Sequence, residues 1–166
     1  MMLMPLIRSA TEADLPAILA IYNHAVAHTT AIWNETPSDL EGRRDWLRER
    51  QGRGFPVLVA EQDGRVAGYA SFSDFRPFEG YRITCEHSVY VAEGARRRGL
   101  GTALVEALIE EARKLGKQSM VGGIDAANTD SIALHAKLGF VEVARMPGVG
   151  TKLGRTLDLV LMQKAL

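Results

Sequence analysis

The sequence predicts an α+β fold, in which one domain spanning residues 1–166 forms a mostly antiparallel central sheet with helices on both faces. The expected elements follow the order strand, two helices, three strands, helix, strand, helix and two strands. A hairpin signal at Asp63-Gly64 and a closing pair of strands indicate antiparallel neighbours. A chain of 166 residues is long enough to bury one core.

The N-terminal part begins with a short strand at residues 5–9 and a helix over residues 11–28. Thr11 is the expected N-cap of that helix, because a hydroxyl there accepts a hydrogen bond from the first turn. The apolar face of the helix carries Leu15, Ile18, Leu19 and Tyr22. A loop then leads to a second helix, which runs from Ser38-Asp39 to the glycines at 52 and 54.

The central part contains a hairpin over residues 55–75, followed by a strand over residues 84–92. A helix begins after Gly99 and has one apolar face and one charged face. Its expected buried side chains are Leu100, Leu104, Leu108 and Leu115.

The C-terminal part reads as a strand at residues 119–124 and a helix within residues 128–140, with Gly139 at its C-cap. Asn128 or Thr129 is expected at the start of this helix. Residues 141–146 and 156–164 finish the chain as an antiparallel pair.

The composition excludes several classes of protein. Twenty lysines and arginines balance 20 aspartates and glutamates, so no overall charge favours nucleic acid or an acidic membrane. One cysteine excludes an intrachain disulfide and suits a reducing compartment. The apolar N-terminal run is short and lacks a signal-peptide cleavage pattern, and no other run is long enough to span a bilayer. We therefore expect a soluble cytoplasmic protein.

The local concentration of positive charge at residues 96–101, with the sequence RRRGLG, lies between a strand and a helix. Glycines allow a tight turn, the first helical N–H groups lack intrahelical acceptors, and arginines bind phosphate through charge-assisted hydrogen bonds. The turn therefore predicts a site for a phosphorylated ligand. The dinucleotide and P-loop fingerprints both fail, because Leu104 replaces the third glycine of the first and no Gly-Lys-Ser/Thr follows. A basic, solvated helix cap is the alternative.

Several motifs together resemble one family. The stretch VYVAEGARRRGLGTALV, followed by NTDSIALHAKLGF, is similar to the GNAT acetyltransferase superfamily. The motifs IYNHAV, TTAIWNETP, FRPFEGYR, EHSVYV and GRTLDLVLMQ resemble its phosphinothricin and methionine sulfoximine N-acetyltransferase branch, so the similarity covers almost the whole chain. The chain departs from the branch at Thr156, where tryptophan is usual, and at Leu153, where phenylalanine is common.

The resemblance implies a site for acetyl-CoA and no metal. The backbone of one strand would pair with the pantetheine arm, as an added strand does; its residues are Val89, Tyr90 and Val91. The turn would hold the pyrophosphate through main-chain N–H groups; its residues are Arg97, Arg98, Gly99, Leu100, Gly101 and Thr102. Asn128 would contact the cofactor from the next helix.

Acyl transfer to an amine requires a base, because only the neutral amine attacks a thioester. Glu86 is the expected base, and its position opposite Cys85 and His87 on the strand gives it a separate face. A surface ion pair is the alternative role for Glu86. His135 occupies the helix position where many family members have a tyrosine that can protonate the leaving thiolate. A local hydrogen bond on the helix is the alternative role for His135.

Two other patterns suggest chemistry less specifically. Cys85 would be the nucleophile of a ping-pong mechanism, but a lone cysteine in a strand is more often a small buried hydrophobe. His24 and His28 have metal-ligand spacing on a helix, but no third ligand accompanies them. We therefore expect direct attack of the amine and no metal site.

The substrate is expected beside the FRPFEGYR segment. Arg76 is suited to a bidentate pair with an α-carboxylate or an oxidised head group. Aromatic side chains would line the pocket or pack in the loops; they are Trp33, Phe75 and Phe78. The branch also uses positions that correspond to Pro77, Phe78, Glu86, His87 and Ser88. The implied substrate is a small amino acid such as methionine sulfoximine, methionine sulfone or phosphinothricin.

Two other functions remain open, and the chain is expected to form a homodimer. A module that binds or senses acetyl-CoA without catalysis is one alternative, and acetyltransfer to a peptide or another amine is a second. The resemblance implies a homodimer, and the apolar terminal strand TLDLVLMQKAL is expected to require cover on both faces.

Overall fold

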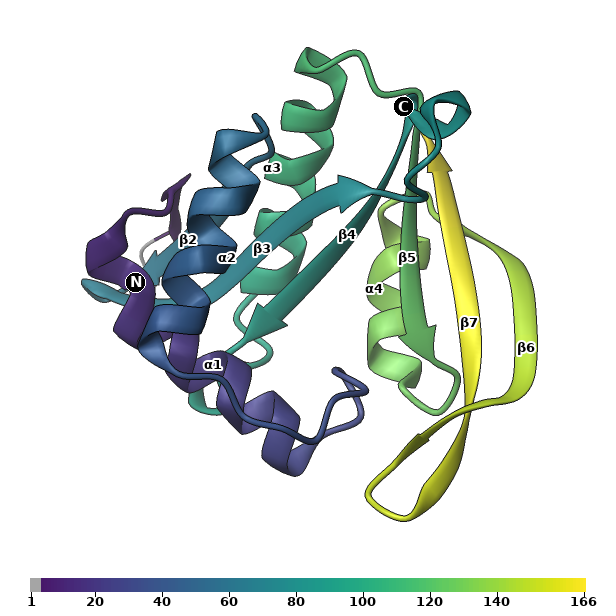
Figure 1. Cartoon of the computed structure of the whole chain (residues 1–166), viewed down its shortest axis with the longest axis horizontal. Coiled ribbons are helices and arrows are strands. Elements are labelled where there is room, and N and C mark those ends of the chain that lie inside the picture. The colour runs from purple at the N-terminus through teal and green to yellow at the C-terminus, as the bar shows by residue number, and fades with distance from the viewer. Residues whose placement is uncertain (1–3) are drawn as a thin grey trace.

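The computed structural model describes residues 4–166 and shows a seven-stranded sheet in the order β1-β2-β3-β4-β5-β7-β6 (Figure 1). The strands are β1 (Leu6–Ser9), β2 (Val57–Gln62), β3 (Arg65–Asp74), β4 (Thr84–Val91), β5 (Ser119–Asp125), β6 (Val141–Lys152) and β7 (Arg155–Ala165). Among these neighbours only β4 and β5 are parallel. The predicted, mostly antiparallel α+β fold is confirmed.

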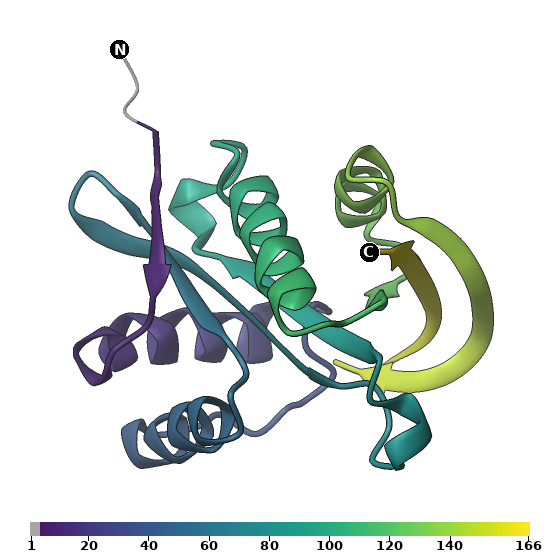
Figure 2. The same ribbon diagram turned by 90° about the horizontal axis from the view of Figure 1, so that it is seen from above.

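Helices cover both faces of the sheet. Figure 2 shows α1 (Leu15–His28) and α2 (Leu40–Gly52) on one side, with α3 (Leu100–Lys114) and α4 (Thr129–Lys137) on the other. The alternation of side chains along β2 explains this arrangement: Val57 and Val59 pack with the first pair of helices, whereas Leu58 and Ala60 pack with α3. Short 3₁₀ turns lie at Glu12–Asp14, Glu79–Tyr81 and Glu93–Ala95.

The expected hairpin turn is present between β2 and β3. Gln62 faces Arg65, so the turn has two residues, and both Asp63 and Gly64 have positive φ values, of 53° and 75°. This is the geometry that Asp-Gly favours, because glycine and aspartate tolerate the left-handed region better than other residues.

The sheet opens between its two parallel strands. The register of β4 with β5 ends at His87 and Gly122, although β4 remains paired with β3 as far as Val91. β5 remains paired with β7 as far as Asp125. The two strands therefore diverge, as Figure 1 shows, and one edge of the last β4 residues is turned toward the opening.

Two local expectations are wrong. Leu115 is not buried but 49% exposed, because α3 ends at Lys114 and the C-cap residue leaves the helical periodicity. The strand expected over residues 141–146 extends to Lys152, as β6. It forms one edge of the sheet and carries exposed apolar side chains, whereas β7 lies between β5 and β6.

Within residues 4–166, no helix is long and apolar enough to cross a membrane. The start of the N-terminal apolar run, residues 1–3, lies outside the described residues.

Candidate active site

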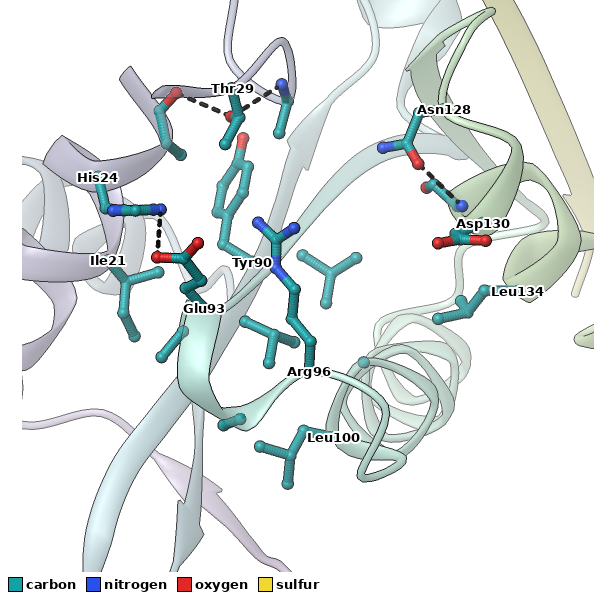
Figure 3. Close-up of a pocket in the computed structure, with 18 of the residues that line it drawn as sticks. Ile21, His24, Thr29, Tyr90, Glu93, Arg96, Leu100, Asn128, Asp130 and Leu134 are labelled. Carbon is teal, nitrogen blue, oxygen red and sulfur yellow. Dashed lines mark hydrogen bonds and ion pairs between the residues drawn. The ribbon is translucent and has the colours of Figure 1, made fainter. Parts of the chain in front are cut away.

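A cleft of about 1000 Å³ lies at the opening between β4 and the start of α4. Figure 3 shows that its wall comes from four parts of the chain: the end of α1, the end of β4, the turn before α3, and the first turn of α4. The divergence of β4 from β5 therefore creates the space, and the Arg-Gly turn forms one end of it.

The backbone of the Arg-Gly turn is specialised. Gly99 is the N-cap of α3 with φ of 78°, and a Cβ atom there would meet no atom within 4 Å, so glycine is needed for its conformation rather than for space. At Gly101 the space itself is limited, because a Cβ atom would lie 3.1 Å from Leu134 Cδ1. Leu100 is buried and anchors the turn, so that the first N–H groups of α3 lie at the cleft.

The three arginines of the turn do not share one environment. Arg96 and Arg97 line the cleft, and the side chain of Arg96 points into it beside Tyr90 (Figure 3). Arg98 instead approaches Asp63 at the β2–β3 turn, with 3.8 Å between its Nη1 and the carboxylate Oδ2. The side chain of Arg98 is therefore directed away from the predicted phosphate position. From the sequence, Arg96 belonged to the basic turn but received no cofactor contact, because three consecutive arginines in an irregular turn carry no periodic signal of which side chain faces a ligand.

The predicted cofactor strand has a suitable edge. The main chain of Val89, Tyr90 and Val91 pairs with β3 on one side and borders the cleft on the other. An extended ligand is able to bind such an edge as an added strand does. Thr102 and Asn128 also line the cleft. The side-chain oxygen of Asn128 caps α4 by accepting a hydrogen bond from the Ser131 N–H at 3.1 Å.

Glu86 lies on the opposite face of β4 from Cys85 and His87, as the alternation predicted. Its side chain is half-buried, and burial raises the pKa of the carboxyl, while the charge of Arg76 acts in the opposite direction. A Cβ atom at Gly123 would lie 3.7 Å from Glu86 Oε2, so the carboxylate stands at the opening between the strands. A carboxyl with a raised pKa is better matched to general-base work near neutral pH.

The predicted substrate loop is exposed. Arg76 stacks over the Phe75 ring at 4.3 Å and donates a hydrogen bond to the Phe75 carbonyl at 2.9 Å. Pro77 and Phe78 are exposed, and 71% of Phe78 is accessible. Ser88 is exposed on the Glu86 face of β4. These residues leave one side of the space around Glu86 open.

Trp33 does not line the cleft. Its ring covers the backbone of Gly150 in the β6 strand, where a Cβ atom would lie 2.2 Å from the ring. Its indole N–H donates to the Thr30 carbonyl at 2.9 Å. The loop between α1 and α2 is thus held by a distant strand, while Thr30 lines the cleft and donates a hydrogen bond to Asp125. Sequence reasoning missed both Thr30 and Asp125.

His87 and His135 are buried and in contact. His87 is 5% exposed and His135 is 3% exposed, and 2.8 Å separates their Nε2 atoms. His87 therefore lies away from the predicted substrate face, on the side of α4. The His135 Nδ1 is 2.7 Å from the Ser131 carbonyl, which is the local helix contact considered as its alternative role. Both rings line a small cavity of about 80 Å³ that adjoins the cleft.

The remaining candidate groups do not form a second reactive centre. Cys85 is fully buried, and burial raises the pKa of its thiol to about 12, so it is protonated and unreactive at neutral pH. His24 lies 3.4 Å from Glu93 across the rim of the cleft (Figure 3). Across residues 4–166, no group of three or more His, Cys, Asp or Glu side chains is arranged to hold a metal ion.

A family model described as the acetyltransferase (GNAT) family matches residues 18–140, which include most of the cleft lining, the Arg-Gly turn and both buried histidines. The chain belongs to this family. The predicted family is thereby confirmed.

Known proteins resemble this acetyltransferase over nearly its whole length. An L-methionine sulfoximine/L-methionine sulfone acetyltransferase from Pseudomonas aeruginosa is 56% identical over 158 residues, which cover 95% of this chain and 92% of the relative. The solved structure of yncA, a putative acetyltransferase from Salmonella typhimurium with its cofactor acetyl-CoA, is 53% identical with a TM-score of 0.95, covering 98% and 94% of the two chains. A crystal structure of a ribosomal-protein-alanine N-acetyltransferase from Brucella melitensis is 58% identical with a TM-score of 0.95, covering 97% and 99%.

The residues of this acetyltransferase fit acetyl-CoA, the acetyl donor of the family. The edge of the last β4 residues and the basic turn before α3 both line one cleft of about 1000 Å³. The strand edge suits the amides of such a ligand, the cleft is large enough for its length, and the basic turn suits its diphosphate.

Proposed function

We propose that this enzyme transfers the acetyl group of acetyl-CoA to the α-amino group of a small amino acid by direct attack. The candidate substrates are methionine sulfoximine, methionine sulfone and phosphinothricin. The observation that carries the proposal is the position of Glu86, a half-buried carboxylate with Arg76 near enough to influence its pKa. A base for the ammonium and a cation for the carboxylate are the two groups that an α-amino acid requires.

The cofactor roles are assigned by position. The main chain of Val89 to Val91 binds the pantetheine arm, while the turn around Gly99 and Gly101 and residue Thr102 bind the diphosphate through N–H groups. Arg97 adds positive charge, and we assign the same role to Arg96 because it points into the cleft. Asn128 contacts the cofactor from α4, whereas Arg98 contributes mainly through its backbone.

The chemical roles follow from the two faces of β4. Glu86 takes a proton from the bound ammonium, directly or through water, so that the amine attacks the thioester carbonyl. Ser88, on the same face of β4, and the exposed Pro77 and Phe78 border the substrate on the open side. His135 on the other face is the candidate proton donor for the departing sulfur. The His135 Nδ1 contacts the Ser131 carbonyl and its Nε2 contacts the His87 Nε2. His87 therefore influences the proton that His135 would donate.

The test of this function is a panel of amines assayed by release of the CoA thiol. Oxidised methionine analogues and phosphinothricin should be acetylated with higher kcat/KM than unmodified amino acids. A peptide with an N-terminal alanine belongs in the panel, because the name of the Brucella melitensis protein suggests that substrate. Preference for the peptide would replace the proposed substrate, and no transfer to any amine would favour a binding module.

Replacing Arg76 by alanine should raise the KM for the amino acid about 10-fold or more and leave the KM for acetyl-CoA nearly unchanged. The lost partner of the carboxylate removes ground-state and transition-state binding alike. Arg82 is an exposed arginine beyond the same 3₁₀ turn, so Arg82→Ala is the matched control. Steady-state kinetics with both substrates check the result, and equal KM values for Arg76→Ala and the parent would remove Arg76 from the site.

We further propose that the enzyme is a cytoplasmic homodimer. The supporting observation is the apolar surface of the edge strand β6, whose exposed side chains are Val141, Val143, Met146 and Val149. The single cysteine is buried and unpaired, which suits a reducing compartment.

Sedimentation at micromolar concentration should show one species with twice the chain mass of 18.2 kDa. Val143→Lys should shift it toward the monomer, because a charge on this surface opposes association. Ile83→Lys, at an exposed apolar residue outside β6, should leave the dimer intact. A parent protein that sediments as a monomer would refute the proposal.

A further inference from the structure

The buried contact between His87 and His135 has an unusual arrangement of hydrogen bonds. The His87 Nδ1 is 3.0 Å from the Val121 carbonyl oxygen, and the His135 Nδ1 is 2.7 Å from the Ser131 carbonyl oxygen. The two Nε2 atoms face each other at 2.8 Å. All three contacts are within hydrogen-bond distance, and each needs a proton between its two atoms.

Two neutral imidazole rings carry two N–H protons between them, which is one fewer than the three contacts need. A carbonyl oxygen only accepts, so each Nδ1 must donate its proton to its carbonyl. A neutral imidazole carries a single N–H, which leaves a lone pair on both Nε2 atoms. Two lone pairs repel at 2.8 Å unless a third proton lies between them. As long as both carbonyl contacts are kept, all three hydrogen bonds form only when the pair carries one positive charge.

The surroundings oppose a permanent charge. Burial lowers the pKa of both histidines, and the nearness of His135 adds to the effect at His87. The neutral pair has an alternative donor, because the Ser131 hydroxyl is 3.4 Å from the His135 Nδ1. If this hydroxyl donates to Nδ1, the His135 proton moves to Nε2 and is donated to His87. The pair is thus able to exist in a neutral and a cationic form with little movement.

Other titratable groups near the pair are few. Asp125 at the end of β5 lines the same small cavity, and it accepts hydrogen bonds from Thr30 and from the Ala127 N–H. Cys85 lies on the same face of β4 and is protonated, whereas Glu86 lies on the opposite face. Phe140 packs against both rings at centroid distances of 5.4 and 5.1 Å and brings no charge.

The architecture of β5 accommodates the pair. Gly122 lies beside His87, and a Cβ atom there would be 2.9 Å from the His87 Cε1. Any larger residue would displace the ring from its contact. The cavity of about 80 Å³ is large enough for ordered water and is lined by both rings. Six of its lining residues also line the cleft; they are Ala31, Val89, Tyr90, Asp125, Asn128 and Ser131.

Acetylation of an amine requires that two protons leave its nitrogen. An amino group is an ammonium at neutral pH and keeps one N–H in the amide product, while CoA leaves as a thiol. One proton is therefore released, and the second is needed by sulfur. This inference rests on the proposed function, in which Glu86 accepts only the first proton. His87 points from the other face of β4 toward His135 of α4, and both line the small cavity next to the cleft.

We propose that His87 and His135 form one proton-binding unit, which takes up the second proton on the Nε2–Nε2 bridge and returns it to the CoA sulfur. After the N–C bond forms, the positively charged nitrogen loses a proton to an Nε2 lone pair through water in the small cavity. The C–S bond then breaks with its electron pair on sulfur. The bridging proton moves to sulfur to form S–H, and the pair becomes neutral again. His87 is not placed against the substrate; it acts through His135 by sharing the bridging proton.

Two substitutions of His87 separate a proton-binding role from a structural one. His87→Gln keeps an amide donor near the Nε2 position, so His135 retains its hydrogen bond, but it cannot take up a proton. His87→Asn keeps a donor for Val121 and loses the bridge. We expect kcat to fall by about 10²-fold or more in both variants, the usual scale for loss of acid–base catalysis, with unchanged acetyl-CoA affinity. His28→Gln, at an exposed histidine of α1, should behave as the parent.

The kinetic comparison uses whichever amine the panel identifies. If His87→Gln restores kcat while His87→Asn does not, His87 only holds His135 in place, and the proposal is wrong. A failure of the amino-acid function would appear differently, as a change of accepted amine with the same dependence on His87.

A second measurement needs no substrate. The protein has four histidines, so a His24→Gln/His28→Gln variant labelled with ¹⁵N-histidine reports only the buried pair. As the pH falls below about 6.5, we expect both Nε2 signals to move together and to show uptake of one proton for two rings. Separate titration of each ring, or no uptake down to pH 4 in the folded protein, would overturn the proposal.

Discussion

Replacing Gly101 by valine is expected to weaken acetyl-CoA binding at least about 100-fold, which corresponds to about 2.8 kcal/mol. In the proposed site the first turn of α3 presents its N–H groups to the diphosphate, so a branched side chain at this position would block the approach. The space is already restricted, since a Cβ atom would lie 3.1 Å from Leu134 Cδ1 and 3.8 Å from Val91 Cγ2. Isothermal titration with acetyl-CoA measures the loss.

The control for this substitution is Gly52→Val. Gly52 ends α2, has ordinary φ and offers open space around a Cβ atom, so valine there should leave acetyl-CoA binding unchanged. Thermal unfolding of both variants shows whether Gly101→Val remains folded. The contact with Leu134 involves the end of a flexible side chain, and we expect it to adjust by a few tenths of an ångström rather than unfold the protein.

The arginines should matter less than this glycine. Arg97→Ala should weaken acetyl-CoA binding only moderately, and the loss should shrink at high salt, because exposed charges are screened. Arg98→Ala should cost less than Arg97→Ala, since its side chain turns toward Asp63 rather than the cleft. If either arginine variant loses all binding while Gly101→Val retains it, the turn binds through side chains and not through its backbone.

Changing Glu86 to glutamine should lower kcat at pH 7 by about 10²-fold or more, the usual scale for loss of a general base. Glutamine keeps the shape and a hydrogen-bonding oxygen but removes the basicity. The affinity for acetyl-CoA should hardly change, because the Arg-Gly turn is separated from Glu86 along β4. Raising the pH should recover part of the rate, since more of the substrate amine is then neutral.

The pH profile of the parent supplies an independent check. Burial raises the pKa of Glu86, so the parent should lose activity as the pH falls through this raised value and the carboxyl becomes protonated. In the glutamine variant this loss should be absent. We propose measuring kcat and KM from about pH 4.5 to 9.5, which covers the titration of a carboxyl with a raised pKa and of an α-amino group. An unchanged kcat across this range would eliminate Glu86 as the base.

A different outcome would indicate that Glu86 orients the substrate. In that case the KM for the amine would rise strongly, kcat would change less, and the pH profiles of the two proteins would be parallel. Asp74 at the end of β3 is paired with Arg53, so Asp74→Asn is the matched control for loss of a carboxylate.

Local features of this protein were determined by the sequence itself. Asp63-Gly64 specifies a two-residue turn, Gly99 specifies a left-handed residue before a helix, and alternation places Glu86 and Cys85 on opposite faces. Each of these depends on dihedral preferences or periodicity within a few residues, which the sequence displays directly. The same reasoning reached the α+β fold and singled out the Arg-Gly turn, which lines the cleft.

The contacts between distant segments were decided only by the tertiary structure. The register of β4 with β5 brings His87 opposite Gly122, and the packing of α4 then brings His135 to within 2.8 Å of it. A similar long-range contact holds Trp33 against Gly150 instead of in the cleft. Such pairings depend on strand register and helix packing, which arise from the whole core, so residues 48 positions apart in the chain carry no local signal of their contact.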